Sequence, residues 1–185
     1  MKSSLWRKTM REISGETFVK ENPITMLSQD FMILMAQHEG VTNGMTISWG
    51  EFGYLWNQPV FTVFVRKERF TKHLLDESDF CSLCRLNEIG HQYTSYFGTV
   101  SGRDHDKFKD KGLVVNHSQA APYIENSNLV IIGKKLYSTK LKRFDFNDKE
   151  VFTSNYTGNS LHYVYVYRIE KVLVPDKPII LSHLM

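Results

Sequence analysis

The chain has 185 residues, of which 42% are hydrophobic and 13% aromatic, and its formal net charge is +3. This length favours one domain, and the apolar fraction is large enough to fill a core, which excludes a disordered chain. No apolar run is long enough to cross a bilayer, and the N-terminus lacks the apolar stretch of a secretory signal, so we expect a cytoplasmic protein with no membrane association. The small positive charge suits an anionic ligand and does not demand nucleic acid.

The predicted organisation is an N-terminal arm over residues 1–15, which are polar and lack a periodic pattern, followed by a single domain over residues 16–185. Asn22 and Pro23 predict the start of a short helix, because asparagine caps helices and proline suits the first helical position. The strands at 31–37 and 45–49 flank a turn at 38–44 and form a hairpin.

Breaks are expected at 50–53 and 57–59, before the clearest strand of the chain at 60–66. The remaining expected elements are strands at 80–86, 129–136 and 161–174, helices at 70–77, 88–97 and 104–111, and a hairpin within 144–152 around the turn residues Asn147 and Asp148. Many short strands with a few short helices between them favour a mainly β fold, a barrel and not a βαβ sheet.

Several motifs are missing from the sequence: it has no G-x-G-x-x-G, no P-loop and no G-x-S-x-G, and its seven histidines do not fall into metal-binding spacing. Cys81 and Cys84 form a C-x-x-C, which invites a redox or zinc interpretation. We favour a structural one, because residues three apart on a strand point to opposite faces and no second ligand pair exists. No metal site is therefore predicted.

Three segments suggest a binding site. In residues 43–50, Thr46 and Ser48 share one side of a strand next to Trp49, although an ordinary amphipathic strand has the same pattern. In residues 65–72, a strand ends in Arg66, and a cationic turn with Arg69 leads into a helix, which is how anion sites are built. The alternative there is a solvated basic turn with Thr71 capping the helix.

The third segment is residues 101–107, where Gly102 permits a tight turn and Ser101 or Asp104 can cap the helix that follows. Lys107 would reach back from that helix to a phosphate, although a well-capped surface helix explains the same residues. The basic run at 134–143 interleaves lysines with aromatic residues, but a hydrated surface explains it better than nucleic-acid binding.

Taken together, these segments resemble the flavin reductase-like family, whose members are FMN-binding split barrels and include flavoredoxins. The similar stretches are 43–50, 53–60, 65–71 and 96–107, with Gly112 and Leu113 after them, and the resemblance extends over residues 20–175.

The resemblance implies a split β-barrel and a homodimer with FMN at or near the subunit interface. The flavin ring would lie against residues 45–49, and its phosphate would be held by residues 66–71 and 101–107. The implied cofactor-binding residues are Asn43, Met45, Thr46, Ile47, Ser48, Trp49, Arg66, Arg69, Phe70, Thr71, Ser101, Gly102, Arg103 and Lys107.

Two flavin functions follow from the resemblance. In the first, NADH or NADPH binds transiently and passes a hydride to the flavin, so that no catalytic side chain is required. In the second, the protein is an electron carrier that keeps FMN bound and exchanges electrons with a redox partner protein. A non-flavin binding module that uses residues 134–143 is the third hypothesis.

Overall fold

The computed structural model describes residues 9–18, 20–125, 127–156, 158 and 160–176. Its elements in chain order are β1 (Met10–Glu12), α1 (Gly15–Phe18), α2 (Pro23–Ser28), β2 (Met32–His38), β3 (Val41–Ile47), β4 (Gly50–Leu55), β5 (Gln58–Arg66), α3 (Phe70–Glu77), β6 (Phe80–Arg85), α4 (Glu88–His91), α5 (Thr94–Thr99), α6 (Lys107–Asp110), β7 (Val115–Asn116), β8 (Tyr123–Ile124), β9 (Leu129–Lys140), a 3-10 turn (Arg143–Asp145), α7 (Lys149–Asn155) and β10 (His162–Pro175).

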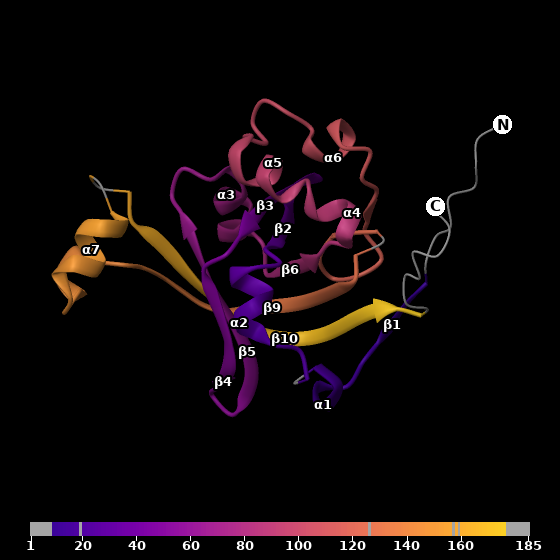
Figure 1. The fold of residues 1–185 in the computed structure, drawn as a ribbon, viewed down its shortest axis with the longest axis horizontal. Coiled ribbons are helices and arrows are strands. Elements are labelled where there is room, and N and C mark those ends of the chain that lie inside the picture. Colours follow the sequence, from indigo (N-terminus) through magenta and orange to yellow (C-terminus); the bar gives the residue numbers. More distant parts are fainter. Residues whose placement is uncertain (1–8, 19, 126, 157, 159, 177–185) are drawn as a thin grey trace.

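One antiparallel sheet dominates the molecule, with the strand order β3-β2-β6-β9-β10-β5-β4 and with β1 added to the end of β10. The long strands β9 and β10 run side by side through the middle of the sheet, and the helices α3 to α6 gather on one side of it (Figure 1). The predicted mainly β fold with short helices is therefore confirmed.

Two hydrophobic clusters form the core, because side chains alternate between the faces of each strand. One contains Leu34, Phe61 and Tyr165, and the other contains Ile33 and Phe97, together with other buried residues. Cys81 belongs to the first cluster and Cys84 to the second, so the two thiols point to opposite faces as predicted. Burial raises the pKa of the Cys84 thiol to about 11 and that of Cys81 further, which leaves both protonated and unreactive.

The turns differ from the sequence prediction in two places. The predicted turn at 38–44 is confined to Glu39 and Gly40, whose φ angles are 47° and 80°, and the strand resumes at Val41. The predicted break at 50–53 is wrong, since these residues lie in β4 and pair with β5. The β4–β5 hairpin turns instead at Trp56 and Asn57, both with positive φ, as a two-residue hairpin loop requires.

The helices differ as well. The predicted helix at 88–97 is two helices, because the Thr94 hydroxyl donates to the carbonyl of His91 at 2.8 Å and replaces continued helical bonding. The predicted hairpin at 144–152 is wrong: Asp148 accepts from the N–H groups of Glu150 and Val151 and so caps α7. In the described part of the chain, no helix is long and apolar enough to cross a membrane.

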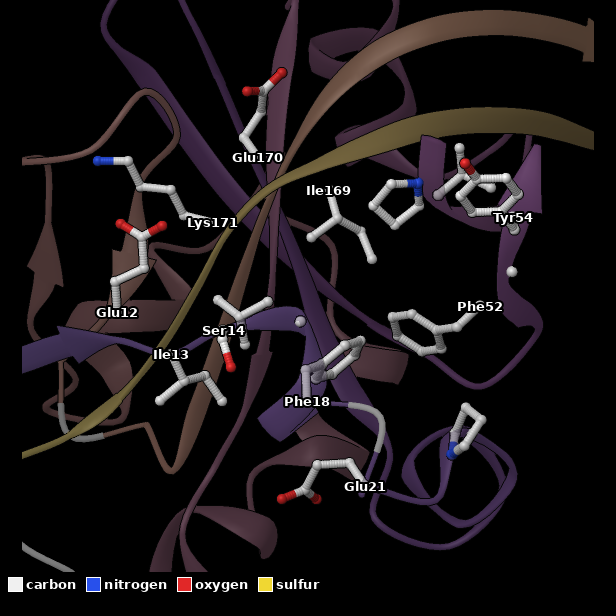
Figure 2. Close-up of a pocket in the computed structure, with 16 residues that line it drawn as sticks. Glu12, Ile13, Ser14, Phe18, Glu21, Phe52, Tyr54, Ile169, Glu170 and Lys171 are labelled. Carbon is white, nitrogen blue, oxygen red and sulfur yellow. The ribbon is translucent and has the colours of Figure 1, made fainter. Parts of the chain in front are cut away.

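Part of the predicted N-terminal arm is a strand, since Met10–Glu12 pairs with β10, while the arm's boundary at residue 15 stays a prediction. A groove of about 640 Å³ lies where β10 passes from its partner β5 to its partner β1. Phe18 and Phe52, which both line this groove, pack edge to face with ring centres 5.6 Å apart, next to Ile169 (Figure 2). None of the predicted cofactor-binding residues lines it.

Candidate anion-binding site

A separate cavity of about 300 Å³ lies where β3, the turn between β5 and α3, and the loop between α5 and α6 meet. We call it the anion cavity. Ten of the fourteen predicted site residues line it: Asn43, Met45, Arg66, Arg69, Phe70, Thr71, Ser101, Gly102, Arg103 and Lys107. The fold thus brings together the two segments that the sequence predicts to hold a phosphate, 66–71 and 101–107, although 29 residues lie between them.

The other four predicted residues do not line the cavity. The hydroxyl of Thr46 donates to the carbonyl of Thr94, and Ile47 is buried in the core. Ser48 and Trp49 follow the end of β3 at Ile47 and are exposed, so the strand is shorter than predicted at this end. Thr46 and Ile47 are the last two residues of β3, and Ser48 and Trp49 follow it, so all four come directly after the cavity residue Met45 in the chain.

Lys107 is the most unusual residue of the cavity, because its charged side chain is only 2% exposed. Its Nζ donates to the carbonyl of Phe97 at 3.4 Å and lies 5.0 Å from the centre of the Phe97 ring. Burial, followed by the nearby positive charge of Arg69, lowers the pKa of Lys107 to about 8. A buried ammonium beside other cations is costly unless an anion joins it.

The three arginines of the cavity are each held in place by backbone carbonyls. Arg66 donates to the carbonyls of Ser160 and Asn155 at 3.2 and 3.1 Å, and Arg69 donates to the carbonyl of Gly98. Arg103 donates to the carbonyl of Glu68 at 3.1 Å, and its guanidinium lies 5.4 Å from the centre of the Phe70 ring. These contacts fix cationic groups around the cavity before any ligand arrives, which lowers the entropic cost of binding.

Asn43, Thr71 and Gly102 form one wall of the cavity. The Asn43 amide donates to the Thr71 hydroxyl at 2.8 Å, and both side chains are buried. Gly102 packs so closely on this amide that a Cβ there would lie 2.2 Å from Asn43 Oδ1. Only glycine therefore fits at position 102, which refines the sequence argument that Gly102 permits a tight turn.

The two helix starts at the cavity have different outcomes: α3 covers Phe70–Glu77 as predicted, whereas the start of α6 differs from the prediction. The residue before α3 is Arg69, and Thr71, which only the alternative interpretation makes the cap, lies inside the helix with its hydroxyl bound by Asn43. No side chain in the described residues caps this helix, so its first N–H groups are left for another acceptor. The predicted helix at 104–111 begins only at Lys107, because the Asp106 carboxylate, and not Ser101 or Asp104, caps it by accepting from the N–H of Lys109.

Several residues of the site carry no recognisable sequence signal. Glu68, Phe97, Thr99 and Val100 also line the cavity. Burial would raise the pKa of Glu68, but a hydrogen bond from Ser160 and the charges of nearby cations hold it below its usual value. Glu68 is therefore a carboxylate at neutral pH, and it is turned toward Ser160.

Next to the cavity, Trp49 and His162 form an aromatic pair with ring centres 4.7 Å apart. His162 Nδ1 lies 3.1 Å from the Tyr156 hydroxyl, and the guanidinium of Arg66 lies 5.7 Å from the Tyr156 ring. Burial, followed by the charge of Arg66, lowers the pKa of His162 to about 4, so the imidazole is neutral at pH 7. Trp49 is exposed and His162 is buried, so the pair offers one exposed indole ring with an uncharged imidazole beside it.

Four cationic side chains and one carboxylate surround the anion cavity: Arg66, Arg69, Arg103 and Lys107, with Glu68. The set is suited to a phosphate, which guanidinium and ammonium groups and an uncapped helix start bind well. Within the described residues, no group of three or more histidine, cysteine, aspartate or glutamate side chains could hold a metal ion.

Comparison with solved structures shows the same fold in several proteins. An FMN-binding domain of a flavin reductases-like enzyme from Shewanella baltica OS155 is 13% identical, with a TM-score of 0.66, over 92% of this chain and 79% of that one. Flavoredoxin from Methanosarcina acetivorans is 21% identical, with a TM-score of 0.62, over 92% and 77%. The styrene monooxygenase flavin reductase from Pseudomonas putida S12 is 14% identical, with a TM-score of 0.57, over 80% and 81%.

Comparison with curated proteins found no match. The fold of the solved structures confirms the predicted split barrel of FMN-binding type. The family model of the flavin reductase like domain matches residues 26–179, which is most of the chain. The chain therefore belongs to the flavin reductase-like family of FMN-binding proteins.

Proposed function

We propose that the anion cavity holds the phosphate of FMN and that the chain is an NADH- or NADPH-dependent flavin oxidoreductase. The observation that carries the proposal is the position of Lys107, a cation that is 2% exposed at a cavity with three arginines. A phosphate dianion there would neutralise charges that the fold otherwise buries without compensation. The close fit of Gly102 on the Asn43 amide fixes the wall of the cavity on that side.

The residues of the chain would divide the work of binding. Lys107, Arg69, Arg103 and the first N–H groups of α3 would hold the phosphate. Ser48, Trp49 and the C-terminal end of β3 would lie along the ring, as the family resemblance implies. When bound, FMN supplies the hydride chemistry itself, accepting two electrons from a nicotinamide, so the protein's task is to bind, orient and shield it.

We also propose that the protein acts as a homodimer. Helix α7 stands apart from the sheet at one end of the molecule (Figure 1). It displays Val151, and the turn before it displays Phe144, which is 96% exposed. Large apolar side chains exposed on a projecting element are typical of surfaces that a partner covers. Sedimentation of the purified protein at several concentrations tests this: a monomer at micromolar concentration would refute it.

The experiment that tests the flavin proposal begins with the visible spectrum of the purified protein and the mass of any bound molecule. A yellow protein that releases FMN supports the proposal, and a colourless protein that does not take up added FMN refutes it. Oxidation of NADH or NADPH is then followed with FMN present. Turnover supports the reductase, whereas tight FMN without turnover supports the alternative, a flavoredoxin-like electron carrier that needs a redox partner protein.

A further inference from the structure

The groove of about 640 Å³ in Figure 2 is separate from the proposed flavin site. Residues from 12–23, 52–60 and 169–172 line it, between β1, α1, the β4–β5 hairpin and β10, and we call it the hairpin groove. Its volume is within the range of sites that hold small molecules, about 300–1,000 Å³. Within the described residues, the hairpin groove and the anion cavity share no lining residue, so a ligand here would be a second one.

The floor of the hairpin groove is apolar. Ile13, Phe18, Phe52 and Ile169 pack against the core on one side and stay only partly buried. A Cβ added at Gly53, which also lines the groove, would meet no heavy atom of the described residues within 4 Å, so the space over this part of β4 is open. An aromatic ring fits such a floor, because it can pack on the two phenylalanine rings as well as on the aliphatic side chains.

The charged side chains of the hairpin groove are mostly carboxylates. Among the described residues that line it, Glu12, Glu21 and Glu170 stand against a single cation, Lys171. The ammonium of Lys171 donates at 3.4 Å to the side chain of Gln119, which lies outside the groove. The anion cavity has the opposite balance, with four cations and one carboxylate. The hairpin groove therefore disfavours a phosphate or a carboxylate and favours a cation.

The carboxylates also keep hydrogen-bonding capacity for a ligand. Arg85 donates to one oxygen of Glu21 at 2.6 Å, and Arg168 donates to one oxygen of Glu170 at 2.7 Å. The second oxygen of each carboxylate has no partner among the described residues, and Glu12 has no ion-pair partner there either. Acceptors of this kind suit a ligand that carries N–H donors.

We propose that the hairpin groove binds an arylalkyl amine, with its ring on Phe18 and Phe52 and its ammonium group at the carboxylates. The ring accounts for the partly buried apolar floor, and the positive charge accounts for the excess of carboxylates at its edge. A neutral apolar compound would leave the carboxylate oxygens without a donor, and an anion would be repelled. The proposal does not depend on the flavin assignment, since the two sites share no described residue.

The charge requirement is tested with three compounds that carry the same ring: naphthylmethylamine, naphthylmethanol and naphthoate. Isothermal titration calorimetry on the full chain at neutral pH measures their dissociation constants, with and without saturating FMN. We expect the amine to bind about tenfold more tightly than the alcohol, and naphthoate to bind most weakly. FMN should leave the affinity for the amine unchanged. Equal binding of the three compounds, or competition by FMN, would overturn the proposal.

Two variants test the position of the site. Gly53→Leu places a side chain in the open space of the groove and should weaken binding of the amine about tenfold. Glu51→Leu is its matched control, because it adds the same side chain to the same strand at an exposed residue outside the groove, and it should bind the amine as the wild type does. Glu12→Gln should weaken binding of the amine about threefold and leave naphthylmethanol unchanged.

The outcomes distinguish the amine from other occupants of the groove. If Gly53→Leu is folded in urea unfolding and binds the amine normally, the amine lies elsewhere and the proposal is wrong. If Gly53→Leu changes the sedimentation of the protein, the groove is a contact between two copies of the chain, which also overturns the proposal. If Gly53→Leu does not fold, Glu12→Gln decides: an unchanged affinity for the amine refutes the site. A protein that binds the amine but no FMN would refute the flavin proposal alone.

Discussion

Proton uptake at Lys107 should make flavin binding depend on pH. In the protein without ligand, burial and the charge of Arg69 lower the pKa of this lysine to about 8. A phosphate dianion at the cavity would favour the charged form and return the pKa to about 10.5 or above. Only the ammonium form binds the phosphate well, so above pH 8 binding requires the lysine to take up a proton from the solvent.

The size of the effect follows from these two pKa values. The ammonium fraction without ligand falls from about 0.9 at pH 7 to about 0.1 at pH 9, while the lysine in the complex stays charged. The dissociation constant of FMN should therefore rise about tenfold between pH 7 and pH 9, which corresponds to about 1.4 kcal/mol. Glu68 stays ionised throughout this window, because its pKa is held below the usual value.

Fluorescence titrations at pH 7, 8 and 9 measure the dependence, with riboflavin, which has no phosphate, as the ligand control. In Lys107→Met the dependence should vanish, and FMN should bind about 30-fold more weakly at pH 7, because one charge-assisted hydrogen bond is lost. The variant should fold well, since it removes a buried unpaired charge. If Lys107→Met keeps the same tenfold change, another group takes up the proton and the reasoning is wrong.

Three further variants test the walls of the cavity and the core. Gly102→Ala should abolish tight FMN binding and lower the free energy of unfolding in urea by about 1–3 kcal/mol, because its methyl group overlaps the Asn43 amide. Gly53→Ala, where the added methyl group meets open space, is the control and should change neither FMN binding nor stability. Thr71→Val should lower the free energy of unfolding by about 1–3 kcal/mol, because the Asn43 donor is left without its acceptor. Thr71→Ser keeps the hydroxyl and should retain most of that stability. Equal losses in the two variants would argue against this hydrogen bond. Iodoacetamide should alkylate both cysteines only in urea, and rapid labelling of the native protein at pH 8 would contradict their burial.

The two phosphate-directed segments could be predicted from the sequence because each is a local pattern. A strand that ends in Arg66 and leads through Arg69 into a helix needs only neighbouring residues to be recognised. Local patterns likewise predict that Gly102 lies in a tight turn and that Lys107 lies in the helix after it. That the two segments lie at one cavity is a tertiary property, which local patterns do not predict. The family resemblance implies it, because it assigns both segments to the phosphate.

The pairing of His162 with Trp49 could not be predicted in this way. The register of β10 on β5 sets His162 opposite Arg66, which is 96 residues earlier in the chain. Nothing near His162 in the sequence indicates that partner, because register is decided by which faces of the two strands are buried. The sequence predicts a hairpin where α7 lies for a different reason: Asp148 is as common in turns as at helix caps, and here it caps the helix.

The contacts of Arg66 decide which variants can isolate phosphate binding. Its guanidinium lines the cavity but is bound to the carbonyls of Ser160 and Asn155, at the end of α7 and the start of β10. Ser160 also donates to Glu68, so three hydrogen bonds tie the α7 region to the rim of the cavity. Replacing Arg66 would release this region as well as remove a cation, and a loss of FMN binding would have two causes. Lys107 has no such second role, because its one hydrogen bond among the described residues, to the carbonyl of Phe97, does not tie another element to the rim, so the affinity change in Lys107→Met reports on the anion itself.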